Sequence, residues 1–451
     1  MAEGGWRISD NCHPGINSEL IGRTWWFQQV SDLNMLEQFH RRPPSAMNVL
    51  MIAPGYPGEM PYFCRGLARQ GGKVYGLSDV PEHELPALTR EHMSGYFRAP
   101  SLTDEEAVVN AVASAMAGHQ IARVVCLWEP GVVLAAKLRE ALGAPGMRVA
   151  QAQTFRNKDL MKQKVTAAGI RTARHASATT IAQVRDAARE IGFPVIVKPI
   201  AGAGSMDTVR AGSAEELDRA LAQVKSYDEV NVEEFIEGEE FTYDTICIDG
   251  RIVYENVCYY RPNPLIARST EWISPQTIAL RDLSSVEVKA GVALGHEVLK
   301  AMEFGTGFTH MEWFYTRKNE AVFGEIAARP PGAHTVDLMN FVGDVDLFDG
   351  YAEAELKGTF SQSTERKYNV SNIFKRAQGK GRIHRIEGLE SIMARFGEHI
   401  VHMDLLPVGA ERRNWIQTLV SDGYVVVRHP DLQECFDMSD AVGTDLQRHA
   451  G

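Results

Sequence analysis

The stretch FTHMEWFYTRKNEAVFGEIAARPPG, residues 308–332, carries the feature that decides the fold of this sequence. We expect a hairpin from Phe308 to Ala327, with Lys318-Asn319 as a two-residue turn. In that register Glu312 lies directly opposite Glu325, and opposed residues share one face of a sheet. Like charges that face each other destabilise a hairpin. A magnesium ion between the two carboxylates, with phosphate oxygens as further ligands, is a reason to keep them.

Other side chains of this stretch are expected on the same face. Counting by twos from Glu325 places Ala327 and Arg329 there if the strand continues, and His310 points the same way. A guanidinium beside a metal and phosphate site suits a transferring phosphoryl group or a carboxylate. The alternative is an exposed hairpin in which the two glutamates are shifted out of register.

A lysine followed by a glycine-rich loop precedes the hairpin. The apolar run FPVIVKP, residues 193–199, indicates a buried strand that ends at Lys198 and Pro199. The strand fixes the lysine stem, and Gly202 and Gly204 of the following loop AGAGS, which ends at Ser205, let backbone amides approach a phosphate. The alternative is an exposed lysine before an ordinary turn.

The acidic segment VEEFIEGEE, residues 232–240, is a candidate nucleotide contact. A strand that leaves a sheet there can offer backbone groups to an adenine edge, while Phe235 and Ile236 cover the ring. A carboxylate beyond them can accept hydrogen bonds from ribose hydroxyls. The alternative is a solvated acidic edge.

Two further positions are ambiguous when taken alone. Lys158 lies on a helix with Lys162 and Lys164 nearby, and a charged helix face is normally solvated. Arg268, in the polar stretch 261–272, belongs either to a mobile loop that faces the substrate or to an ordinary surface loop.

The order of motifs predicts four parts of the chain. Residues 1–46 form an extension of unknown role, and strands alternating with helices over 47–152 predict a parallel α/β domain. Its first turn, APGYPG, is not GxGxxG, which disfavours a dinucleotide site. The centre, 153–367, is rich in β-hairpins, including one with an Asp249-Gly250 turn. A small C-terminal part is expected over 368–451.

Composition excludes several classes of protein. The chain has 451 residues, 44% of them hydrophobic and 23% charged, which is ordinary for a globular protein. A net charge of -11 without a basic block argues against nucleic acid or an anionic membrane as a partner. The sequence has neither a signal-like N-terminus nor a long apolar run, and its six cysteines show no metal-like spacing. A cytoplasmic protein with reduced thiols is therefore expected.

Taken in order, the motifs resemble the ATP-grasp superfamily, and within it the carboxylate-amine ligases whose last subdomains resemble those of biotin carboxylase. The resemblance covers roughly residues 47–440. It implies a mixed α/β and α+β fold: an α/β domain that precedes the ATP-grasp domain, a lid over about 165–235, a central antiparallel sheet and a small C-terminal cap.

The resemblance also implies site residues. Lys158 and Lys198 would contact the phosphates of ATP, and the loop from Gly202 through Gly204 to Ser205 would close over them. The remaining expected roles are an adenine pocket lined by Glu233, Glu234 and Ile236, a ribose contact from Glu240, magnesium ligands Glu312 and Glu325, and an acyl phosphate or substrate carboxylate site at Arg329, with Arg268 aligned less securely. Ala327 departs from the family, which often has asparagine there as a metal ligand.

The implied activity is ATP-dependent joining of a small carboxylic acid to an amine, with amino acids as the expected substrates. Two magnesium ions, replaceable by manganese, would assist, and a homodimer is compatible with the family. The alternatives are a biotin-carboxylase-like or formyl-phosphate enzyme, and a nucleotide-binding protein without catalysis.

Overall fold

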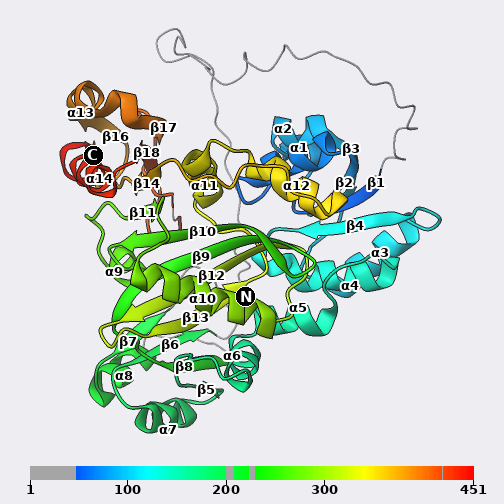
Figure 1. The fold of residues 1–451 in the computed structure, drawn as a ribbon, viewed down its shortest axis with the longest axis horizontal. Helices are drawn as coiled ribbons and strands as arrows, with labels where there is room; N and C mark the ends of the chain where they lie inside the picture. Colours follow the sequence, from blue (N-terminus) through cyan, green and yellow to red (C-terminus); the bar gives the residue numbers. More distant parts are fainter. Residues whose placement is uncertain (1–46, 200–207, 223–228, 419) are drawn as a thin grey trace. The chain divides into compact units, whose positions relative to one another are not determined.

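The computed structural model describes residues 47–199, 208–222, 229–418 and 420–451, shown as a ribbon in Figure 1. The segment 1–46 lies outside the described residues. So do Gly202, Gly204 and Ser205 of the expected phosphate loop.

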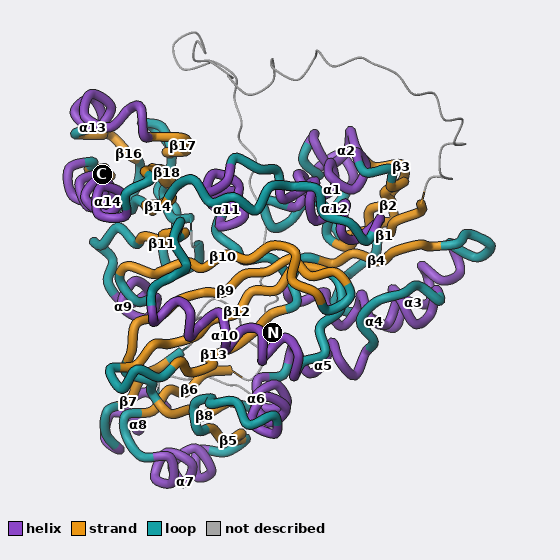
Figure 2. Tube along the Cα trace, in the orientation of Figure 1, coloured by secondary structure: helices purple, strands orange, loops and turns teal. Residues whose placement is uncertain are grey.

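The first described part is a parallel sheet with helices on both faces, as expected (Figure 2). Side chains alternate along its central strand: Val49 and Met51 join one buried cluster, and Leu50 and Ile52 join another. The strand order is β3-β2-β1-β4. The elements are β1 (Met47–Ile52), α1 (Met60–Arg69), β2 (Gly72–Ser78), η1 (Glu82–Glu84), α2 (Ala87–His92), β3 (Met93–Arg98), α3 (Glu105–Ala115), β4 (Ile121–Cys126), η2 (Glu129–Gly131) and α4 (Val132–Leu142).

Helix α12 (Leu347–Lys357), from a distant part of the sequence, packs against α1. Gly66 lies at this contact, where a Cβ atom would come within 2.5 Å of the carbonyl oxygen of Phe348. Arg65 adds an ion pair of 2.9 Å with Asp346, the N-cap residue of α12. The parallel sheet is thereby held against the rest of the described chain.

A small antiparallel sheet with the order β5-β8-β6-β7 lies where the lid is expected. Its helices pack on one buried cluster that includes Val184, Val195 and Val232. Thr180 and Gln183 form a capping box at the start of α7, which explains why the helix begins there. The elements are α5 (Val149–Arg156), α6 (Lys158–Ala167), β5 (His175–Ala178), α7 (Ile181–Ile191), β6 (Val195–Pro199), β7 (Val209–Ala211), α8 (Ala214–Leu221) and β8 (Val230–Glu234).

The largest sheet is antiparallel, with the strand order β13-β12-β9-β10-β11-β14-β18-β17. Helix α10 covers one face, where Cβ atoms at Gly291 and Gly295 would lie 2.0 Å and 2.2 Å from the rings of Trp313 and Tyr243. These glycines let the helix approach the sheet closely. The elements up to the hairpin and the helix after it are β9 (Gly238–Ile248), β10 (Arg251–Arg261), α9 (Pro264–Ser269), β11 (Gln276–Ala279), α10 (Val286–Ala301), β12 (Gly307–Thr316), β13 (Ala321–Ala327) and α11 (Thr335–Gly343).

The C-terminal part continues the same sheet, because β14 pairs with β11 and β18 pairs with β14. Lys375, just after β14, donates hydrogen bonds to the carbonyl oxygens of Val442 and Gly443 in the last turn of α14. The elements are β14 (Asn369–Phe374), β15 (Gln378–Gly379), β16 (Ile383–Glu387), α13 (Leu389–Phe396), η3 (Gly397–His399), β17 (Ile400–Leu405), β18 (Gly423–His429), α14 (Leu432–Asp445) and β19 (Gln447–Ala450).

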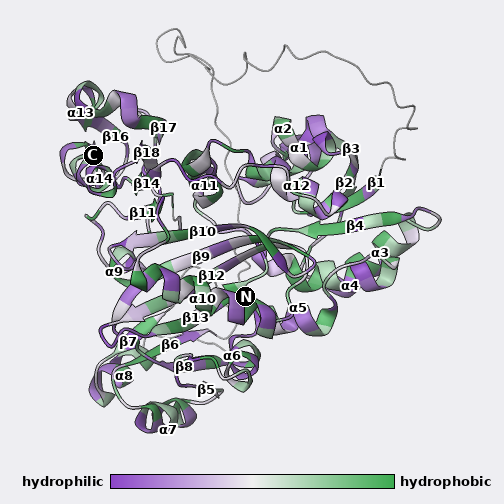
Figure 3. Ribbon diagram, viewed as in Figure 1, coloured by the Kyte–Doolittle hydropathy of each residue, from purple (hydrophilic) through white to green (hydrophobic). Residues whose placement is uncertain are grey.

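Hydropathy follows this layering. Strands such as β4 are largely hydrophobic, whereas helices such as α3 and α7 carry both hydrophobic and hydrophilic residues (Figure 3). Five cysteines in the described residues are free and buried, as expected for structural thiols: Cys64, Cys126, Cys247, Cys258 and Cys435. None of the described helices combines the length and the hydropathy of a membrane span. The expected mixed fold, with a parallel sheet followed by a large antiparallel sheet, is confirmed.

Candidate active site

The hairpin of β12 and β13 brings the two expected metal ligands together. Glu312 is the direct partner of Glu325, and His310 is the partner of Ala327, as the sequence predicts. All four therefore lie on one face of the sheet, opposite to the face that carries Trp313.

The expected two-residue turn, however, is wrong. The turn residues are Arg317, Lys318 and Asn319, because the amide of Thr316 donates to the carbonyl oxygen of Glu320 and Asn319 has a φ of 60°. One extra residue in the turn would shift the register by one position.

A β-bulge restores the register. The pairing jumps from Trp313 with Phe323 to Glu312 with Glu325, which leaves Gly324 as the additional residue of β13. A Cβ atom at Gly324 would lie 2.8 Å from the carbonyl oxygen of Glu312. The bulge thus requires glycine, and it offsets the longer turn.

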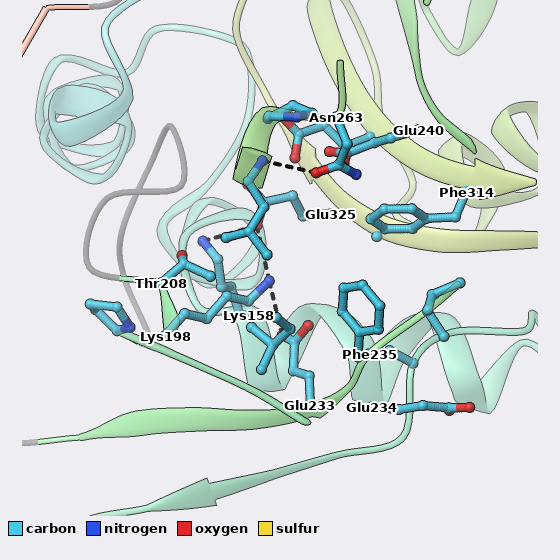
Figure 4. A pocket seen from close by; sticks show the side chains of 18 residues that line it. Lys158, Lys198, Thr208, Glu233, Glu234, Phe235, Glu240, Asn263, Phe314 and Glu325 are labelled. Atoms are coloured by element: carbon cyan, nitrogen blue, oxygen red, sulfur yellow. Dashed lines mark hydrogen bonds and ion pairs between the residues drawn. The ribbon is translucent and has the colours of Figure 1, made fainter. Parts of the chain in front are cut away.

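The carboxylates line a pocket between the small sheet, α6, the hairpin and the start of α9 (Figure 4). Acidic and basic groups stand together in it with Phe235, Ile236 and Phe314. The expected site residues that line it are Lys158, Lys198, Glu233, Glu234, Ile236, Glu240, Glu312 and Glu325.

Lysines contact the acidic residues directly. The Nζ atom of Lys158 lies 3.2 Å from Oε2 of Glu325, and that of Lys198 lies 3.6 Å from the same oxygen. Burial favours the neutral acid at Glu325, but Lys158 and Lys198 outweigh it and lower its pKa. Burial likewise opposes the charge of Lys198, but Glu233 and Glu325 raise its pKa. The pocket therefore holds charged groups of both signs.

Lys162, which was ambiguous from the sequence, also belongs to this network. Its Nζ atom lies 2.7 Å from Oε2 of Glu233, and its side chain is fully buried. Lys164, by contrast, is partly exposed and pairs with the exposed Glu303. The spacing of Lys158 and Lys162 by four residues, with the buried Met161 between them, is the signal that could have indicated an inward face.

Glu234 does not point into the pocket. Its carboxylate binds Arg171 and Arg174 instead, and Figure 4 shows it directed away from the other acidic residues. Glu234 lies at the pocket wall, but its carboxylate faces away from the pocket. Ile236 also lines the pocket, and it belongs to a small apolar cluster with Ala173.

Glu240 and Asn263 form the far end of the pocket. The Nδ2 atom of Asn263 donates a hydrogen bond of 2.6 Å to Oε2 of Glu240. Burial, followed by Glu312 and Glu325, raises the pKa of Glu240 well above its usual range. Asn263 was missed in the sequence, although it caps α9 and follows a strand end.

A buried dyad stands behind Glu312. The Nδ1 atom of His310 lies 2.6 Å from Oδ1 of Asp244, and its Nε2 atom lies 3.7 Å from Oε1 of Glu312. Burial opposes protonation of His310, but Asp244 and Glu312 raise its pKa to about 9.

The two expected arginines lie outside the residues that line the pocket. The Nε atom of Arg329 contacts Oε2 of Glu129 at 2.6 Å, and Arg156 contacts the other oxygen of Glu129 at 2.5 Å. Glu129 follows β4 of the parallel sheet, and no sequence pattern indicates this contact. Arg268, on α9, donates to the carbonyl oxygen of Ile416.

The donor set fits a magnesium ion that is shared with a nucleotide. Glu312 and Glu325 are hard oxygen donors on one face of the hairpin. Within the described residues no group of three or more His, Cys, Asp or Glu side chains could hold a metal ion. An ion here would need phosphate oxygens or water as further ligands, as expected with alanine at position 327.

The fold and this pocket define the class. Residues 163–341 match the ATP-grasp domain family, and the chain therefore carries an ATP-grasp domain, which confirms the expected resemblance.

Several of its relatives are named as ligases. The chain is 27% identical over 233 residues to an L-arginine-specific L-amino acid ligase of Bacillus subtilis, a match that covers 50% of this chain and 55% of that protein. The chain thus spans little more than half of this relative.

Solved structures share the fold over most of the chain. An L-amino acid ligase from Bacillus licheniformis has a TM-score of 0.73 at 21% identity and covers 90% of this chain and 99% of its own. An N5-carboxyaminoimidazole synthetase from Staphylococcus aureus, solved with ADP, has a TM-score of 0.65 at 16% identity, with coverages of 88% and 96%.

Proposed function

We propose that this protein is an ATP-dependent carboxylate-amine ligase that joins amino acids through an acyl-phosphate intermediate. The observation that carries the proposal is the pair of opposed carboxylates, Glu312 and Glu325, in a pocket that also holds Lys158 and Lys198. The amino-acid ligases among its relatives support the choice of substrates.

In this proposal, the nucleotide lies along the pocket. Its adenine packs against Phe235 and Ile236, while backbone groups near Glu233 and Glu234 meet the ring edge. The ribose hydroxyls donate to Glu240, which Asn263 orients. Lys158 and Lys198 turn toward the phosphates, where their ammonium groups offset negative charge.

Glu312 and Glu325 would hold magnesium. The proposal includes two magnesium ions, and manganese could replace them. The metal supplies charge neutralisation at the phosphoryl oxygens when bound. The residues of the chain then have to position the acid and exclude water. Arg329, held at its Nε atom by Glu129, is proposed to bind the acyl phosphate or the acid, and Arg268 to face the same region.

The chemistry has two balanced steps. A carboxylate oxygen of the acid attacks the γ-phosphorus of ATP, the bond to the bridging oxygen breaks, and ADP leaves. The amine nitrogen then attacks the acyl carbon, loses a proton, and phosphate leaves as the amide forms. Arg329 would stabilise the oxyanion of the tetrahedral intermediate.

The experiment is an ADP and phosphate release assay with ATP, magnesium and pooled amino acids. Release that requires both a carboxylate and an amine is expected. Release with bicarbonate or formate in place of the amino acids would favour a biotin-carboxylase-like or formyl-phosphate enzyme. If ATP binds but no acid supports release, the protein is a nucleotide-binding protein without catalysis and the proposal is wrong.

A further inference from the structure

Lys162 is a fully buried cation to which the proposed mechanism gives no role. It lies one helical turn after Lys158 on α6, but unlike Lys158 it is absent from the described residues that line the pocket. A buried ammonium is costly unless it is paired. Its partner is Glu233, at 2.7 Å, on the neighbouring small sheet.

Glu233 is shared between two lysines. Its Oε2 atom is bound by Lys162, and its Oε1 atom lies 3.1 Å from Nζ of Lys198 and accepts a 2.9 Å hydrogen bond from Asn231. The residue is only 6% exposed, so water does little to satisfy its charge. A carboxylate at this depth needs at least one cation at all times.

Lys198 has a further acidic partner besides Glu233. It also lies 3.6 Å from Glu325, and the proposed function requires it to reach the nucleotide phosphates. If it leaves Glu233, Lys162 is the one cation among the described residues whose ion pair with the buried carboxylate remains. Without Lys162, the attraction of Glu233 would hold Lys198 in place and compete with the phosphates.

We propose that Lys162 is a positioning residue, the permanent counter-ion of Glu233, which leaves Lys198 free to transfer its ammonium group to the nucleotide. Lys162 acts through Glu233 and does not touch the nucleotide. This inference rests on the proposed function, because it assumes that Lys198 meets phosphate.

The test is calorimetric titration with the non-hydrolysable ATP analogue AMP-PNP and magnesium. For Lys162→Met we expect binding weakened by at least roughly tenfold, a coupling typical of charged neighbours. Lys162→Arg should restore affinity to within about threefold of the natural protein, because it keeps the charge. The matched control is Lys164→Met on the same helix, which should bind as the natural protein does, since Lys164 pairs with the exposed Glu303.

The double variant Lys162→Met, Glu233→Gln separates positioning from a general loss of structure. With no carboxylate to compensate, loss of Lys162 should have no effect, so the double variant should bind within about threefold of Glu233→Gln alone. A neutral pair is also tolerated in a core better than a single uncompensated charge. The comparison of the double variant with Glu233→Gln tests the positioning role of Lys162 even if Lys162→Met alone does not fold, as judged by circular dichroism.

Two results would overturn the inference: Lys162→Met that binds as tightly as the natural protein, or a double variant roughly tenfold weaker than Glu233→Gln. If the natural protein itself does not bind AMP-PNP, the proposed function fails instead. The two failures are therefore distinguishable.

Discussion

At the scale of single residues, Glu325 links the hairpin to two lysines of the pocket. It faces Glu312 across the hairpin and contacts Lys158 and Lys198. Glu325→Gln keeps the size of the side chain but removes the charge that would hold magnesium. We expect kcat to fall at least about 100-fold, because several kcal/mol of charge stabilisation are lost. The measurement is ADP release at saturating substrates.

Glu320, an exposed residue of the same hairpin, provides the control. Glu320→Gln should leave kcat unchanged, and both variants should melt cooperatively. Near-normal turnover of Glu325→Gln at saturating magnesium would remove Glu325 from the metal site.

Glu129 holds a second charged group in place. It lies between Arg156 and Arg329, and although burial opposes its charge, the two arginines lower its pKa. Glu129→Gln should therefore free Arg329 to adopt other positions. We expect kcat/KM for the acid to fall roughly 10- to 100-fold, as for loss of a charged hydrogen bond. The affinity for AMP-PNP should stay the same.

Steady-state kinetics with the acid varied would measure this effect. Glu105→Gln, which removes a more exposed partner of Lys137, is the matched control and should change neither constant. An unchanged kcat/KM for Glu129→Gln would mean that Arg329 does not need this contact.

Contacts within one local motif can be predicted from this sequence, whereas contacts between distant motifs cannot. The facing of Glu312 and Glu325 follows from strand periodicity, so it could be predicted. Glu129 could not, because its contact with Arg329 joins two sheets that are distant in the sequence. The sequence alone does not decide whether Lys162 is buried, because a charged helix face is usually solvated. The position of Glu233 beside it in the structure does decide this.

At the scale of elements, the hairpin has the predicted register at Glu312 and Glu325, but its turn and its β-bulge differ from the prediction. The turn has one more residue than expected, and the bulge at Gly324 offsets it. The sequence contained a cue, since an isolated glycine within a strand often marks a bulge. Register depends on both features, so a change at either one should move Glu325.

Gly324→Ala tests this dependence. The new Cβ atom would lie 2.8 Å from the backbone oxygen of Glu312, which a side-chain rotation cannot relieve. We expect a loss of roughly 1–3 kcal/mol in the free energy of unfolding, as for other overpacked sites. Turnover should fall as well, because Glu325 would be displaced.

Urea unfolding and the ADP assay together provide the measurement. Gly305→Ala is the control, because nothing lies within 4 Å of a Cβ atom at that position. If Gly324→Ala keeps both its stability and its activity, the bulge does not set the register.

The junction of β14 with α14 should make stability depend on pH. Lys375 donates to Ser274 and to carbonyl oxygens at the end of α14, and burial lowers its pKa from 10.5 to about 7. Between these values the unfolded chain binds the proton and the folded chain does not. Stability should therefore rise with pH from about 7 toward 10 on account of this group.

Thermal melts of the natural protein and of Lys375→Met at pH 7 and pH 9.5 would measure it. The advantage of the natural protein over the variant should be greater at the higher pH. Lys357→Met, which removes an exposed lysine, should show no such trend. A difference that is constant with pH would mean that Lys375 stays charged in the folded protein.

At the scale of the whole described molecule, the candidate site is built from parts that are far apart in sequence. The small sheet supplies Lys198 and Glu233, and the largest sheet supplies Glu312 and Glu325. Glu129, in η2 after the parallel sheet, holds Arg329 outside the residues that line the pocket. The expected C-terminal cap proves to share the largest sheet with the hairpin. Pairing between β11 and β14 joins distant segments, so no local pattern could indicate it.

Because the small sheet and the largest sheet both line the pocket, a bound nucleotide should stabilise them together. AMP-PNP with magnesium at 100 times its Kd should add about 2.7 kcal/mol to the free energy of unfolding, and Tm should rise accordingly. Magnesium alone should have almost no effect. The described residues bring no third carboxylate to Glu312 and Glu325 to complete a metal site, and Lys158 and Lys198 already neutralise Glu325. Differential scanning calorimetry with magnesium, with AMP-PNP and EDTA, and with both ligands measures each contribution.

The variant Glu325→Gln provides the control. In this variant, the further rise in Tm that magnesium gives in the presence of AMP-PNP should disappear. In the natural protein, magnesium alone could raise Tm as much as it does in the presence of AMP-PNP. That result would show that the ion binds without phosphate, contrary to the shared site proposed for Glu312 and Glu325.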